Sequence, residues 1–289
     1  TEPDDRGISP GILAETLVAA ILCGCRPLYR VETFWENRAV GVFYEGENIT
    51  ADRLNDDAYA RMLDRFSAVN CSRLFETVCH KMLQHHSLSV TLAHSDTTSI
   101  SVEGVYDGQD PENPLLTFGH SKDRRPDLKQ LKMGLSVQEQ GLPLSGEVLA
   151  GNTSDQVWNP EAVQGLSKLL AEGGCCDTIF LADCALVSTA SLKKLSQEGI
   201  SFISRLPETF GLAGELKDSA WEENRWEDLG TLAEKEAKKA ARYKVCSYRR
   251  SIDGQEFGFV VVHSTNLEER KEKTLEKALE RTSVSLRKQ

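Results

Sequence analysis

Two aspartates stand where carboxylates can carry metal chemistry. Asp96 follows the segment 88–93, in which apolar residues alternate with polar or small ones, and Asp183 follows the apolar run Thr178–Ala182. Alternation with a period of two and short apolar runs both predict strands. Each aspartate is therefore expected at the end of a strand. If these strands are neighbours in one sheet, the two carboxylates can face each other.

Two carboxylates held close together repel, and a cation offsets that repulsion. A hard, oxygen-binding ion such as Mg²⁺ or Mn²⁺ suits such a pair. Two ions bound in this way would activate an attacking oxygen and stabilise a leaving one. Asp96 and Asp183 are therefore the candidate catalytic and metal-binding residues. The alternative is that each aspartate only caps the loop or helix after its strand.

The position of Asp96 also suits a second chemistry. An aspartate after an apolar strand is also typical of phosphotransferases that form an aspartyl phosphate. Those enzymes carry a second aspartate two positions later, where this chain has Thr98. The strands predicted around Asp96 also form hairpins and no parallel βαβ unit, which disfavours this interpretation.

A basic segment lies between the two aspartates. Five basic residues occur between Gly119 and Lys132, against the two acids Asp123 and Asp127. The whole chain has a net charge of −10, which disfavours simple binding of nucleic acid, but a local basic stripe is what neutralises phosphates. The residues predicted to contact DNA are Lys122, Arg124, Arg125 and Lys129. The alternative is a solvated loop.

The elements that must position these residues change character along the chain. Segments 11–25, 52–66 and 72–84 show helical periodicity, so the first part is expected to be mostly helical. Four strands are then predicted, one up to Asp96 and the others over 99–105, 132–138 and 144–149. After them helices and strands alternate: a helix starts at Asn159-Pro160, a strand precedes Asp183, a helix covers 188–198 and a strand covers 200–206. Beyond Pro207 an irregular region, a hairpin around Asp253-Gly254 and a charged helix over 267–287 are expected. This order predicts a mixed sheet with helices packed on it.

Composition sets wider bounds. With 289 residues, 40% of them hydrophobic, the chain is long enough for about two globular domains. It contains no apolar run of bilayer length and no signal-peptide pattern. The eight cysteines lack zinc-site spacing and are expected to be free thiols in a reducing cytoplasm.

Several stretches of the sequence resemble a known family. The segments 94–99 (HSDTTS), 119–130 (GHSKDRRPDLKQ), 145–155 and 180–186 (FLADCAL) are similar to transposases of bacterial insertion sequences, in particular to the insertion-sequence-four superfamily and its 1634-type branch. The start of the chain, including 54–57 and 61–65, resembles the helical amino-terminal domain of that family. The run Ser-Lys-Asp-x-Arg-Pro-Asp-Leu is the most specific of these matches.

The resemblance implies an α/β (α+β) fold with an RNase H-like mixed sheet and flanking helices. It places a helical, DNA-binding domain at 1–87, the catalytic core at 88–206, a β-rich insertion at 207–262 and the start of a carboxy-terminal helix at 263–289. It also implies a DDE triad with two Mg²⁺ or Mn²⁺ ions, in which Asp96 is the first acid and Asp183 the second. The implied reaction is cleavage and strand transfer of double-stranded DNA at transposon ends, by a homodimer acting in the cytoplasm.

The third acid of the triad has no match. The family's glutamate lies on a helix with tyrosine, arginine and lysine at set spacings, and neither Tyr243 nor Tyr248 begins such a pattern. Glu268, Glu269 and Glu272 stand on the predicted last helix without those neighbours. We therefore expect a chain that ends before the third acid and is inactive by itself, or a non-catalytic DNA-binding or regulatory remnant of a transposase.

Overall fold

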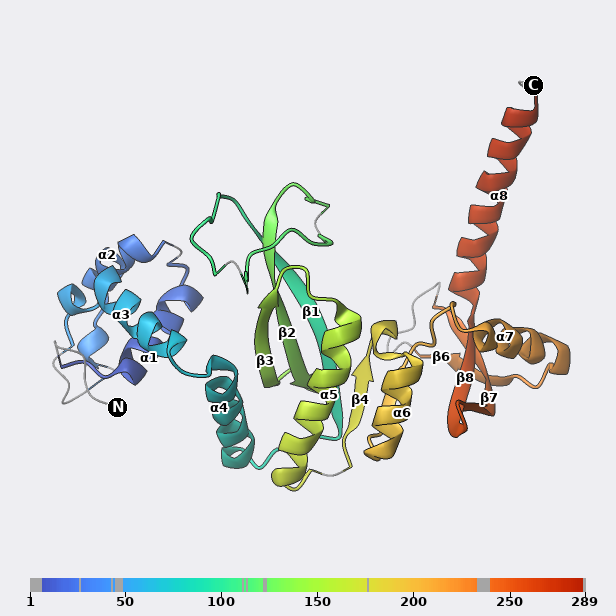
Figure 1. Ribbon diagram of the computed structural model, residues 1–289, viewed down its shortest axis with the longest axis horizontal. Helices are drawn as coiled ribbons and strands as arrows, with labels where there is room; N and C mark the ends of the chain where they lie inside the picture. The colour runs from blue at the N-terminus through green and yellow to red at the C-terminus, as the bar shows by residue number, and fades with distance from the viewer. Residues whose placement is uncertain are drawn as a thin grey trace. The chain divides into compact units, whose positions relative to one another are not determined.

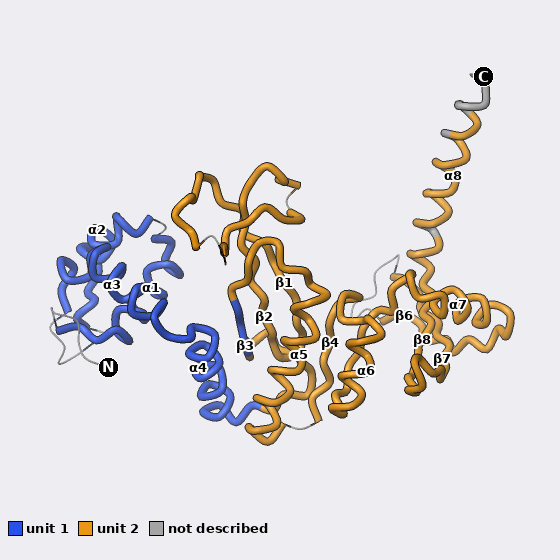
Figure 2. The backbone as a smooth tube through the Cα atoms, viewed as in Figure 1, with its two compact units in different colours: residues 1–88, 145–147 blue, residues 89–144, 148–289 orange. Residues whose placement is uncertain are grey.

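The computed structural model describes residues 7–25, 27–42, 44, 49–110, 112, 114–121, 124–175, 177–232 and 240–287. The chain divides into two compact units, shown in Figure 2: residues 1–88 with 145–147, and residues 89–144 with 148–289. In the described ranges, no helix combines the length and the apolar character needed to cross a bilayer.

The first unit is helical, as expected from the periodicity. Its helices are α1 (Pro10–Leu22), α2 (Val31–Glu36), α3 (Asp56–Ser67) and α4 (Cys71–His85), with 3-10 turns at Leu28–Arg30, Val40–Val42 and Ala51–Arg53. Three of the four helices begin at a polar cap whose side chain accepts a backbone N–H: Ser9 before α1, Asn55 before α3 and Asn70 before α4. These helices begin at residues 10, 56 and 71, and the corresponding predicted segments begin at residues 11, 52 and 72.

A buried hydrogen-bond chain ties three helices of this unit together. Tyr59 on α3 is fully buried, and its hydroxyl accepts from Trp35 Nε1 at 3.1 Å and donates to Thr16 Oγ1 at 3.0 Å. Thr16 in turn donates to backbone carbonyls of α1. Because each polar group here has a partner, the tyrosine can lie in the apolar core without an unpaired hydroxyl.

The second unit contains a five-stranded mixed sheet (Figure 1). Its strands are β1 (Leu92–Val102), β2 (Lys129–Gln138), β3 (Pro143–Ala150), β4 (Ile179–Ala182) and β5 (Phe202–Ser204), in the order β3-β2-β1-β4-β5. β1 pairs antiparallel with β2 and parallel with β4, and β4 pairs parallel with β5. The hairpin strands at one edge and the parallel strands at the other confirm the predicted RNase H-like fold.

The structure corrects the prediction for the first strand. Residues 92–102 form one continuous strand, where the sequence was divided into a strand ending at Asp96 and a second over 99–105. Thr97 and Thr98 fall between the two predicted strands, but the whole polar run Ser95–Ser99 pairs with β2. Asp96 therefore lies inside a strand, while Asp183 directly follows one as predicted.

One helix packs on this sheet and a second helix packs against the first. α5 (Asp155–Glu172) contacts β1, and α6 (Thr189–Gln197) contacts α5. α5 begins four residues before the predicted start at Asn159, because the Ser154 side chain caps it by accepting from Gln156 N; Pro160 lies inside the helix and does not start it. Ser188 caps α6, and Gly199 with its positive φ ends it, as predicted.

The region after Pro207 is more regular than expected. It contains α7 (Gly211–Glu223), where the sequence predicted an irregular region, and a second sheet of β6 (Glu227–Thr231), β7 (Arg242–Ile252) and β8 (Gln255–Ser264) in the order β6-β7-β8. Asp253 and Gly254 both have positive φ and close the predicted hairpin as a two-residue turn. The last helix, α8 (Thr265–Arg287), contacts β7 and β8.

Candidate functional site

Strand register brings the backbones of the two candidate acids together. In the parallel pair of β1 and β4, Ser95 is the partner of Ala182, which is the last residue of β4. The next residue along each chain is Asp96 on β1 and Asp183 after β4. The two aspartates, far apart in sequence, thus occupy neighbouring positions at the middle of the sheet, Asp96 inside β1 and Asp183 directly after β4.

The side chains of β1 alternate between two different environments. Ala93, Ser95 and Thr97 are buried on the face that α5 covers, whereas His94 and Asp96 are exposed on the opposite face. The carboxylate of Asp96 accepts a hydrogen bond from the backbone N–H of Thr97 at 2.8 Å. Asp96 is therefore accessible to a ligand from the face that carries no α5.

Asp183 has a different role at the end of its strand. Its Oδ1 accepts from Ala185 N, which caps the short 3-10 turn Cys184–Leu186, and from Asn159 Nδ2 on α5, both at 2.9 Å. The capping alternative raised from the sequence is thus real for Asp183. Capping occupies only Oδ1, and within the described part of the chain Oδ2 has no hydrogen-bond partner.

This donor set fits a hard divalent cation in chemistry. Exposed carboxylate oxygens at neighbouring strand positions are the ligands that Mg²⁺ and Mn²⁺ prefer. Asp183 is exposed, and hydrogen bonds fix its Oδ1 while its Oδ2 stays available to a ligand. Among the residues that the structure describes, no third histidine, cysteine, aspartate or glutamate completes a metal-holding cluster.

Beside these acids lies a polar network that was not predicted from the sequence. Lys132 on β2 has only 9% of its side chain exposed, and its Nζ donates to Asp155 Oδ1 at 3.0 Å and to Thr153 O at 2.7 Å. The same Asp155 oxygen accepts from Thr97 Oγ1 at 2.8 Å. Lys132 was counted with the exposed basic segment, and its alternation with Met133 on a strand was the available signal that it points inward.

The basic segment itself is largely solvent-exposed. Arg124 and Arg125 are exposed, Arg125 forms an ion pair with Asp127 at 2.8 Å, and Lys129 Nζ donates to Val105 O at 2.5 Å. Hydrogen bonding to the Arg125 guanidinium, aided by its charge, holds the pKa of the Asp127 carboxyl below its usual value. Lys122, also predicted to contact DNA, lies outside the described residues.

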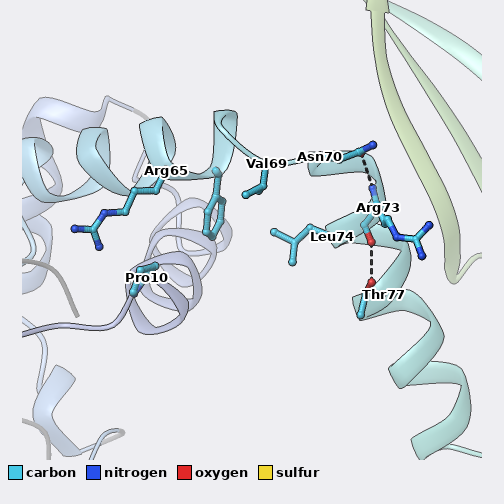
Figure 3. A pocket seen from close by; sticks show the side chains of 8 residues that line it. Pro10, Arg65, Val69, Asn70, Arg73, Leu74 and Thr77 are labelled. Atoms are coloured by element: carbon cyan, nitrogen blue, oxygen red, sulfur yellow. Dashed lines mark hydrogen bonds between the residues drawn. The ribbon is translucent and has the colours of Figure 1, made fainter. Parts of the chain in front are cut away.

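A pocket of about 670 Å³ lies in the first unit, away from any candidate acid in sequence (Figure 3). Its lining comes from α1, α3, α4 and the α3–α4 connection: Pro10, Arg65, Phe66, Val69, Asn70, Arg73, Leu74 and Thr77. Two of its polar side chains serve the helix itself, since Asn70 caps α4 and Thr77 bonds to the Arg73 carbonyl. The lining supplies no carboxylate, thiol or imidazole for catalysis.

Comparison with known proteins gives one family match. Residues 2–80 match the model of a domain of unknown function (DUF4277). No curated protein matches the chain.

Several solved structures of transposases are distantly similar to this chain. A Mos1 transposase paired-end complex with its left transposon end has 12% identity and a TM-score of 0.27, and covers 66% of this chain and 57% of its own. The Mos1 mariner paired-end complex with Mn has 13% identity, a TM-score of 0.28 and coverages of 71% and 72%. The piggyBac transposase synaptic complex with hairpin DNA has 11% identity, a TM-score of 0.37 and coverages of 87% and 51%.

This chain spans less than two thirds of the length of the first two Mos1 chains that it matches, 57% and 58%. With TM-scores below 0.5, these similarities carry no weight for function. The fold assignment rests on the strand order and the register of the sheet.

Proposed function

We propose that this chain is a transposase of the DDE type, related to the 1634-type branch of the insertion-sequence-four superfamily, that acts on DNA by phosphoryl transfer. The observation that carries the proposal is the register of β1 and β4, which sets Asp96 and Asp183 at neighbouring positions of an RNase H-like sheet. The family-like motifs around both aspartates support the same assignment.

In the proposed site, Asp96 and Asp183 hold the divalent ions. Bound Mg²⁺ or Mn²⁺ supplies charge stabilisation to the attacking and leaving oxygens of the phosphodiester. Asp183 contributes Oδ2, because its Oδ1 is engaged by Asn159 and Ala185. Asp96 contributes its exposed carboxylate from the adjacent strand. Mos1 paired-end complexes are known with Mn and with Mg, and we propose the same ions for this chain.

Double-stranded DNA is the proposed partner, as in the Mos1 complex with its left transposon end. Lys122, Arg124, Arg125 and Lys129 are the residues proposed to contact phosphates. Arg125 would exchange its exposed ion pair with Asp127 for a phosphate, and such surface pairs contribute little stability. A homodimer is proposed for the active complex.

A second candidate function is a non-catalytic DNA-binding or regulatory protein. It is favoured by one observation: in the described ranges, no third acidic group clusters with Asp96 and Asp183. Glu268 and Glu272 lie in the first turns of α8, a helix that contacts β7 and β8, and Glu268 is 3.4 Å from His263. Both candidates keep the DNA partner and differ in whether DNA is cut.

The test combines Mn²⁺ binding with Mn²⁺-dependent nicking of supercoiled plasmid. We expect Asp96→Asn and Asp183→Asn each to weaken Mn²⁺ binding by more than about 100-fold, since each removes a charged ligand, and to abolish any nicking that the unmodified chain shows. Asp218→Asn makes the same change at an exposed position of α7 and is the matched control.

Three results separate the possibilities. Nicking that both site variants abolish supports the transposase. Mn²⁺ binding and DNA binding without nicking favour the non-catalytic candidate. If Mn²⁺ binds no better to the unmodified chain than to the two site variants, the proposed site is wrong.

A further inference from the structure

One helix, α5, contacts both the strand that carries Asp96 and the 3-10 turn that Asp183 caps. Asp155 and Asn159 are four residues apart on α5, so their side chains project from the same face of the helix. Asp155 accepts from Thr97, the residue after Asp96 on β1. Asn159 donates to Asp183, the residue after β4. A single helical turn thus bridges the two positions.

The Asn159 contact is direct and buried. Asn159 is only 2% exposed, and its Nδ2 lies 2.9 Å from Asp183 Oδ1. Together with Ala185 N, it fixes one carboxylate oxygen and thereby sets the direction of the other. An amide donor does this without adding charge, so the carboxylate keeps its full charge for a cation.

The other end of the same amide argues against a purely structural role. Asn159 Oδ1 is buried and has no hydrogen-bond partner within the described residues. Leaving a buried carbonyl oxygen unpaired costs stability, and an apolar side chain of similar size would avoid that cost. The contact with Asp183 explains why an amide stands at this position.

The Asp155 contact anchors the other strand. Thr97 is 3% exposed and donates to Asp155 Oδ1, which is also held by the nearly buried ammonium of Lys132. Lys132 in turn binds the carbonyl of Thr153, just before the α5 cap. The start of α5 is therefore fixed to β1 and β2 by charged hydrogen bonds, which are stronger than neutral ones.

We propose that Asn159 and Asp155 are positioning residues, which through α5 set the separation and orientation of Asp96 and Asp183 for divalent cations. The inference rests on the proposed function, because it assigns the role of groups around the same metal site. Residues that orient metal ligands typically change metal affinity by about 10–100-fold when they are lost.

The experiment measures Mn²⁺ affinity by titration calorimetry or electron paramagnetic resonance, together with the unfolding temperature. Asn159→Leu removes the donor and keeps the side-chain volume roughly constant. Gln164→Leu is the matched control, because it removes another buried amide from α5, one whose Nε2 has no partner in the described part of the chain. Asp183→Asn reports loss of the ligand itself.

We expect Asn159→Leu to weaken Mn²⁺ binding about 10–100-fold, while Gln164→Leu binds as the unmodified chain does and the two variants unfold at similar temperatures. Asn159→Ala, which adds no new contact, should show the same loss and serves if the leucine variant does not fold. Unchanged Mn²⁺ affinity in Asn159→Leu or Asn159→Ala, with Asp183→Asn impaired, overturns the positioning role alone. Unchanged affinity in Asp183→Asn overturns the proposed function as well.

Discussion

Gly134→Ala tests the packing that seats α5 on the sheet. Gly134 lies on β2 directly opposite Thr97, and a Cβ at this position would come within 2.2 Å of Trp158 Cζ2 and 2.4 Å of Cε2. Favourable carbon–carbon contacts begin at roughly 3.5 Å, so the ring would have to retreat by about 1.3 Å. Trp158 is 4% exposed, which leaves it little room to do so.

We expect this overpacking to cost about 3 kcal/mol, the upper end for an added methyl in a close-packed core. Hydrogen exchange of backbone amides, followed by mass spectrometry of peptides from β1, β2 and α5, measures this cost locally. A loss of 3 kcal/mol corresponds to roughly 100-fold faster exchange where opening is a rapid equilibrium that precedes the exchange step. Because Asn159 follows Trp158, Mn²⁺ affinity should fall with it.

The matched control is Gly165→Ala on the exposed side of α5, where an added Cβ meets nothing within 4 Å. That substitution should stabilise α5 by about 0.5–1 kcal/mol, because alanine loses less backbone entropy in a helix than glycine does. If Gly134→Ala exchanges no faster than the unmodified chain, Trp158 does not pack on β2, and the bridging role of α5 loses its structural basis.

Two further predictions concern the basic segment and the helical unit. Reversing Arg124 and Arg125 to glutamate should weaken duplex DNA binding and reduce the slope of log K against log salt by about 2, one per lost phosphate contact. An electrophoretic or anisotropy titration at several salt concentrations measures this slope. An unchanged slope would show that the segment does not contact DNA. Tyr59→Phe should cost about 1–3 kcal/mol in denaturant unfolding, because it leaves the buried Trp35 N–H without its acceptor. Burial raises the pKa of Tyr59, so its contribution is complete below the ordinary tyrosine pKa near 10 and is lost as pH rises through the folded pKa; the phenylalanine variant should lack that alkaline loss, and equal loss in both proteins would contradict the assignment.

Much of the secondary structure could be predicted from the sequence because its signals are local. Polar caps such as Ser9 and Asn70 mark helix starts, and the Asp253-Gly254 pair marks a hairpin, since each feature acts within a few residues of itself. Where local signals misled, tertiary pairing was the reason. The sequence predicts two strands around the polar residues after Asp96, yet their backbone groups pair with β2 and form one strand.

The candidate site divides along the same line. From the sequence alone, Asp96 and Asp183 can be recognised as acids next to predicted strands, with a basic segment between them. Only the tertiary structure decided that β1 and β4 are parallel neighbours in a register that aligns the two acids, and that Lys132 turns inward to Asp155. The hydrogen bond from Asn159 to Asp183 also follows only from the fold. The physical reason is that side-chain direction follows from local strand and helix periods, whereas the partner of a buried amide or ammonium is set by which elements pack together.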